Sequence, residues 1–171
     1  MKTKTMVLTG MMTAILAVLS IIQIPMPSGV PITLQTFAVA LCGYVLGSKS
    51  GAVSTFLYVL LGGIGLPIFA GMTAGVGILF GYTGGFLFGF IPMAFLCGLG
   101  IHGKNRVLPI VWGILGLAIC HLLGTVQFSI VSGTGLLPSF LLVSVPYLVK
   151  DVLSVAGAAV VAIAIRKGLA S

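Results

Sequence analysis

The chain has 171 residues, of which 59% are hydrophobic and 5% are charged, and its formal net charge is +7. Soluble domains carry about a quarter charged residues, so this composition excludes a soluble globular protein with a solvated surface. The basic residues are scattered between apolar runs and form no patch, which argues against nucleic acid as a partner and for a lipid bilayer.

Six apolar segments, separated by Pro and Gly, predict an all-α membrane protein with six transmembrane helices. The expected ranges are 6–24, 32–46, 51–65, 84–101, 107–130 and 139–165. A transmembrane helix needs about 20 residues, and short ones have about 17. The second and third segments are short, so we expect them to be tilted, partly buried or joined to re-entrant backbone. We expect residues 1–171 to form one domain.

The first apolar segment follows Lys2 and Lys4 and could be a signal peptide or the first helix. It is long for a signal peptide, and the Pro-rich stretch that follows is a poor cleavage site, so we interpret it as a helix. Small residues at helical spacing in it are Gly10, Thr13, Ala14 and Ala17. They predict a close-packing face, either for a partner helix or for packing within the chain.

Polar and aromatic residues gather around the second segment and the long connection over 67–83. Gln35 and Thr36 begin an apolar helix, where an amide needs a partner in the protein or in a ligand. The connection is uncharged and half apolar, which predicts a lid or half-buried segment over the bundle; a flexible connector is the alternative. Nearby aromatic residues that could pack on a flat apolar ligand are Phe69, Tyr82, Phe86 and Tyr147.

Lys150 and Asp151 are charged residues inside the last apolar segment, and Asp151 is the only acidic residue of the chain. Charges inside a membrane are costly and face the bundle interior, so both are candidates for a functional site. Neighbours on a helix point about 100° apart, so the two groups could border one cavity from two sides without bonding. The structural alternative is a self-neutralising pair or a lysine that reaches outward.

The charge pattern predicts that both termini are cytoplasmic. With six spans, the segments 25–31, 67–83 and 131–138 lie outside and carry no charge. The basic residues on the inner side are then Lys2, Lys4, Lys49, Lys104, Arg106, Arg166 and Lys167. Positive residues prefer short cytoplasmic loops, so this distribution supports the six-span prediction. It also places Lys150 and Asp151 in the outer half of the membrane.

No residue pattern of this chain favours an enzyme, a metal site or a cofactor. Gly98-Leu-Gly-Ile-His-Gly-Lys104 fits a phosphate-binding loop, but Asn105 stands where a Ser or Thr would hold magnesium, and no strand precedes it. His102 and His121 lack a second ligand at metal spacing, so each is interpreted as an ordinary hydrogen-bonded histidine. The three cysteines lie in apolar runs and are interpreted as packing residues.

Three motifs together resemble the BioY family, the biotin-binding S components of energy-coupling factor (ECF) transporters. They are Pro31-Ile-Thr-Leu-Gln-Thr36, Gly62-Gly-Ile-Gly-Leu-Pro-Ile-Phe-Ala-Gly71 and Gly81-Tyr-Thr-Gly-Gly-Phe86. In the third motif, Tyr82 replaces the proline that is usual in the family. Pro146-Tyr-Leu-Val-Lys-Asp151 is similar to the family's last helix, and the resemblance covers essentially the whole chain.

The resemblance implies an S-component bundle in a prokaryotic cell membrane, a scaffold (T) subunit and two ATPase (A) subunits as partners, and biotin bound near the outer surface. It also implies that Gly10, Thr13, Ala14 and Ala17 form the docking face for the scaffold. Asp151 could accept hydrogen bonds from the ureido ring, and Gln35 or Thr73 could bond that ring. Lys150 and the backbone from Gly71 onward could bind the biotin carboxylate. An S component for another vitamin and a self-sufficient secondary carrier remain alternatives.

Overall fold

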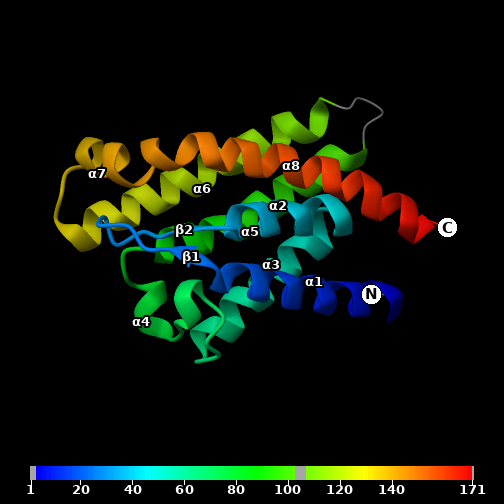
Figure 1. Ribbon diagram of the computed structural model, residues 1–171, viewed down its shortest axis with the longest axis horizontal. Helices are drawn as coiled ribbons and strands as arrows, with labels where there is room; N and C mark the ends of the chain where they lie inside the picture. The colour runs from blue at the N-terminus through cyan, green and yellow to red at the C-terminus, as the bar shows by residue number, and fades with distance from the viewer. Residues whose placement is uncertain (1–2, 103–106, 171) are drawn as a thin grey trace.

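The computed structural model describes residues 3–102 and 107–170, and these residues are mostly helical (Figure 1). The longer helices are α1 (Thr3–Ile21), α2 (Gln35–Leu46), α3 (Ser48–Gly63), α5 (Gly84–Leu99), α6 (Leu108–Ser132), α7 (Leu136–Val143) and α8 (Val145–Ala170). The short elements are η1 (Ala70–Met72), α4 (Val76–Leu79), η2 (Gly100–His102) and the antiparallel strands β1 (Gln23–Ile24) and β2 (Ile32–Thr33). The prediction of an all-α fold is confirmed.

Three of these helices are long and apolar enough to cross a membrane: Thr3–Ile21, Leu108–Ser132 and Val145–Leu169. The helices α2 and α5 are apolar but shorter, with 12 and 16 residues. At a rise of about 1.5 Å per residue, 12 residues reach only about 18 Å. The short second segment therefore forms a short helix, as predicted, and its side chains are mostly buried in the bundle.

The predicted last helix over 139–165 is wrong at its start, because the structure divides this region into α7 and α8. The break is at Ser144, between Val143 and Val145. Pro146 lies in the first turn of α8, where its missing N–H costs no hydrogen bond. Lys150 and Asp151 therefore lie in the second turn of a new helix and not in the middle of a long one.

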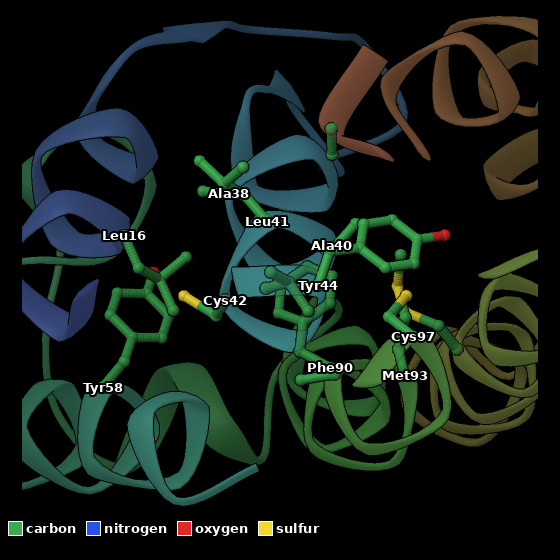
Figure 2. Close-up of a cluster of buried hydrophobic side chains, with 14 of the residues drawn as sticks. Leu16, Ala38, Ala40, Leu41, Cys42, Tyr44, Tyr58, Phe90, Met93 and Cys97 are labelled. Atoms are coloured by element: carbon green, nitrogen blue, oxygen red, sulfur yellow. The ribbon is translucent and has the colours of Figure 1, made fainter. Parts of the chain in front are cut away.

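The helix α2 lies at the centre of the bundle and packs against α1, α3, α5 and α8. Figure 2 shows side chains of α2 between Leu16 of α1 and Tyr58 of α3 on one side and Met93 and Cys97 of α5 on the other. Gly43 allows α2 and α5 to approach closely, because a Cβ at this position would lie closer than 3.0 Å to the carbonyl oxygen of Ala94. Small residues that let backbones meet are typical of helix contacts in membranes.

The two ends of the described chain lie together at one end of the long axis, whereas α4 and α7 lie toward the other end (Figure 1). Lys4 Nζ donates to the carbonyl oxygen of Leu169 at 3.3 Å, which joins α1 to α8. Arg166 donates to the carbonyl oxygen of Tyr44, in the last turn of α2, at 3.2 Å. Lys2, Lys104 and Arg106, which belong to the predicted charge pattern, lie outside the described residues.

The four small residues predicted as one face of α1 divide into two groups. Gly10 and Ala14 are exposed, and space around Gly10 is open. Thr13 is buried, and its hydroxyl lies 3.0 Å from that of Ser54 in α3. Ala17 is half-buried and packs against the core. The prediction that all four form one docking face is therefore wrong for Thr13, which joins α1 to α3.

Candidate functional site

A cavity opens at the end of the bundle that lies away from the chain termini. It measures about 630 Å³, including the space at its mouth, and is lined by β2, α2, the segment 67–83, α5, α6 and α8. Its wall is mainly apolar and aromatic, with a few polar groups from different helices, which is the usual construction of a small-molecule site. Of the predicted binding residues, those that line it are Gln35, Thr36, Phe69, Thr73, Phe86, Tyr147, Lys150 and Asp151.

Asp151 is the polar centre of the cavity and is only 5% exposed. Its Oδ2 atom lies 3.1 Å from Nε2 of His121 in α6. Its Oδ1 atom forms an ion pair with the ammonium of Lys150. Each oxygen of an ionised carboxylate can accept two hydrogen bonds, so Oδ1 can accept one from a ligand in addition to the Lys150 contact.

Lys150 compensates the charge of Asp151 directly, which the sequence did not require. Its side chain is 30% exposed, and Nζ also donates to the carbonyl oxygen of Thr33 at 3.1 Å. The two charged residues therefore form a pair that joins α8 to the strand before α2, and they do not border the cavity separately. Both still line it.

The part that His121 plays in the site is not evident from the sequence. The sequence predicts an ordinary hydrogen-bonded histidine, and in the structure the residue that it bonds is Asp151. Nδ1 lies 3.0 Å from the hydroxyl of Ser144, which itself lies 2.9 Å from that of Thr125. Only the packing of α6 on α7 and α8 brings these groups together, so no local spacing in the sequence could have revealed them.

Gln35 finds its partners within the protein. Its Nε2 atom donates to the hydroxyl of Tyr58 at 2.7 Å, and its Oε1 atom accepts from Thr33 Oγ1 at 3.0 Å. Tyr58 also meets the ring of Phe69 edge-on, with centroids 5.5 Å apart. An amide has two N–H donors, so one remains for a ligand in the cavity.

The segment 67–83 folds back over the bundle, as predicted. Phe69 is 1% exposed and inserts its ring over Gly62 of α3. The N–H of Gly75 donates to the carbonyl oxygen of Gly62 at 2.7 Å. Thr73 lines the cavity, and its hydroxyl donates to the carbonyl oxygen of Ala70.

Two predicted binding residues do not line the cavity. Tyr82 is 46% exposed and packs against Phe128, with ring centroids 5.4 Å apart. Gly71 has a φ of 65° and faces the side chain of Gln23, so its role is to turn the backbone. Their closeness in sequence to other candidate residues does not determine whether a side chain points into the cavity.

Gln127 of α6 holds the end of the 67–83 segment against α6 through two hydrogen bonds. Its Nε2 atom donates to the carbonyl oxygens of Leu79 at 2.8 Å and Gly81 at 2.9 Å. Replacing Gln127 by Glu turns this donor into a carboxylate that faces two carbonyl oxygens. We expect about tenfold faster hydrogen–deuterium exchange in residues 76–84, because about 1.4 kcal/mol of local stability corresponds to a factor of ten.

The variant Gln127→Met provides the comparison for this prediction, because it removes the donor without adding a charge. Its exchange rate should lie between those of the wild type and Gln127→Glu. Equal exchange rates for residues 76–84 in all three proteins would show that the hydrogen bonds of Gln127 do not stabilise this segment.

The chain is similar over its whole length to known proteins. The BioY family model matches residues 1–171. The "Probable biotin transporter BioY" of Pyrococcus horikoshii is 35% identical over 162 residues, covering 95% of this chain and 96% of that protein. The "Biotin transporter BioY" of Rhodobacter capsulatus is 42% identical over 137 residues, covering 77% of this chain and 72% of that protein. A crystal structure described as the S-component for biotin from an ECF-type ABC transporter matches with a TM-score of 0.89 and 26% identity, covering 97% of this chain and 92% of that one.

Proposed function

The chain belongs to the BioY family, and from this membership we propose that it is a membrane subunit that binds biotin and delivers it to an ECF-type importer. The observation that carries the proposal is the Asp151 carboxylate, which is buried and lines the cavity, with Oδ1 able to accept a hydrogen bond from a ligand beside the Lys150 ammonium. The relatives are named as transporters, in agreement with the prediction that the chain is not an enzyme. The proposal needs biotin as the transported ligand and no resident cofactor.

The lining of the cavity matches the chemistry of biotin group by group. Biotin has a ureido ring with two N–H donors and one carbonyl, an apolar thiophane and chain, and a carboxylate. In this proposal, Asp151 accepts from a ureido N–H, and Gln35 offers its remaining donor to the ureido carbonyl. The rings of Phe69 and Phe86 enclose the thiophane. The biotin carboxylate meets Lys150 or backbone N–H groups beyond Gly71.

The arrangement of the chain supports six spans with both termini in the cytoplasm of a prokaryotic cell. Basic residues of α1 and α8 lie at the end that holds the termini, whereas the cavity lies at the opposite end. Because positive residues favour the cytoplasmic side, the cavity then faces outward, where an importer meets its substrate. In this proposal the six spans comprise the three long apolar helices together with the shorter helices α2, α3 and α5.

The partners in this proposal are a scaffold (T) subunit and two ATPase (A) subunits, and Gly10 and Ala14 of α1 are the docking residues. Replacing Gly10 by Leu should leave biotin binding by the isolated subunit unchanged, because space around Gly10 is open. The larger side chain should reduce ATP-dependent biotin uptake at least tenfold in liposomes that contain the whole complex, because close helix contacts need small residues. Uptake equal to that of the wild type would remove Gly10 from the docking face.

Calorimetry with purified protein tests the proposed function. Biotin should bind tightly with a stoichiometry of one, and other vitamins should not displace it at a hundredfold excess. Preferential binding of another vitamin would overturn the biotin assignment. Uptake into liposomes by the chain alone, driven by an ion gradient, would instead favour a secondary carrier.

A further inference from the structure

A chain of buried polar groups leads from α6 to the Asp151 carboxylate. Thr125 and His121 lie one turn apart on α6, and Ser144 lies at the break between α7 and α8. The contacts are 2.9 Å from Thr125 to Ser144, 3.0 Å from Ser144 to Nδ1 of His121, and 3.1 Å from Nε2 to Asp151. All four residues are at most 5% exposed.

The hydrogens of this chain can be assigned from its chemistry. An ionised carboxylate only accepts, so Nε2 of His121 must donate to Asp151. Lys150 already balances the charge of Asp151, so a second buried positive charge on the imidazole would be uncompensated and costly. A neutral imidazole has one N–H, which leaves Nδ1 as an acceptor. Ser144 therefore donates to Nδ1, and Thr125 donates to Ser144.

This assignment leaves His121 with no donor for a ligand. Both ring nitrogens have partners in the protein, and the ring meets Phe86 edge-on, with centroids 5.7 Å apart. Oδ2 of Asp151 is bonded to His121, whereas Oδ1 contacts the Lys150 ammonium and keeps a second lone pair for a ligand. The effect of the imidazole on a ligand must therefore pass through Asp151.

We infer that His121 is a positioning residue for biotin recognition, which Ser144 and Thr125 hold in the Nε2–H form so that it fixes the Asp151 carboxylate with Oδ1 toward a ureido N–H. This inference rests on the proposed function. Partners that orient a ligand-binding group from behind typically contribute about 10- to 100-fold in affinity at metal sites, and we expect the lower end here.

A double-mutant cycle tests the coupling of His121 to Asp151. His121→Phe keeps a flat ring without donors and should weaken biotin binding about tenfold. His121→Gln should bind more tightly than His121→Phe, because its amide can donate from nearly the position of Nε2. In the Asp151→Asn background, His121→Phe should change the affinity less than twofold, since the carboxylate it positions is gone. An equal loss in both backgrounds, or no loss in the wild-type background, would overturn the inference.

A second measurement does not depend on biotin affinity. The chain has two histidines, so His102→Gln leaves His121 as the only imidazole for ¹⁵N NMR of histidine-labelled protein. We expect a protonated Nε2 and an unprotonated Nδ1, and a mixture of both forms after Ser144→Ala. A proton on Nδ1, or a spectrum that Ser144→Ala leaves unchanged, would overturn the inference. Failure of the wild type to bind biotin would instead overturn the proposed function while this spectrum still reported on the polar chain.

Discussion

Replacing Asp151 by Asn is expected to weaken biotin binding about a hundredfold or more. The carboxylate is buried and lines the cavity, and its Oδ1 atom is the acceptor proposed for a ureido N–H. The substitution removes a charge-assisted hydrogen bond and leaves the Lys150 ammonium without its counter-ion. Removing one member of a buried charged pair typically costs about 2 to 5 kcal/mol, and about 2.7 kcal/mol corresponds to a hundredfold. Calorimetry on the purified variant measures the loss.

The variant Lys150→Met decides whether Asp151 contacts biotin or mainly restrains Lys150. If Asp151 accepts from the ligand, adding Asp151→Asn to Lys150→Met should weaken binding by a further factor of at least ten. If Asp151 only holds Lys150, the double variant and Lys150→Met should bind equally. Equal affinity of Asp151→Asn and the wild type would remove Asp151 from the site altogether.

Replacing Gly62 by Ala is the second substitution for which we expect a large effect. A Cβ at this position would lie closer than 3.0 Å to three atoms of the Phe69 ring, so the ring must leave its place. Phe69 is 1% exposed, lines the cavity and packs on Tyr58, which holds Gln35. Truncating a buried Phe to Ala typically lowers the free energy of unfolding by about 3 to 5 kcal/mol, and displacing the ring loses part of this stabilisation. We expect at least a tenfold loss of biotin affinity and faster hydrogen exchange over 67–75, while the other helices keep their protection.

Two comparisons make this prediction specific to the ring of Phe69. In a Phe69→Ala background, Gly62→Ala should have almost no further effect, because the added methyl group then has space. Gly157→Ala makes the same chemical change in α8, where a Cβ would be in ordinary contact with Phe37 at 3.8 Å. It should leave binding unchanged. If Gly157→Ala lowers biotin affinity as much as Gly62→Ala does, the loss reflects a general sensitivity of the helices to added methyl groups, and the prediction for Phe69 is contradicted.

Hydropathy and Pro/Gly positions were sufficient to predict where most of the longer helices lie, but not the short helix α4 or the division into α7 and α8. Each of the six predicted apolar segments overlaps a helix of the structure, because a continuous apolar run determines a helix through local composition. The break at Ser144 was not predicted. Pro146 indicates that a helix begins or bends nearby, but it does not specify at which residue. The resemblance to the BioY family, which the family model confirms, rested on motifs that are contiguous in the chain.

The candidate binding residues show the same difference. Asp151 and its partner Lys150 could be selected from the sequence, because a charge in an apolar helix is unusual wherever the helix packs. His121 could not be selected, because it lies 30 residues from Asp151 and only the packing of α6 against α7 and α8 joins the two. Thr13 shows the same limit, because helical spacing placed it with Gly10, whereas the contact with α3 buried it.

The sequence by itself determined that this chain is a helical membrane protein with a lone acid inside its last apolar segment, because composition, apolar runs and a lone charge are properties of contiguous residues. Only the tertiary structure decided which groups surround that acid. In the folded chain, Oδ2 of Asp151 bonds His121, and Oδ1 contacts Lys150 beside the cavity. Tyr82 and Gly71 do not line that cavity. The physical reason is that hydrogen bonds and side-chain contacts between helices depend on helix rotation and spacing, which residues distant in sequence set together.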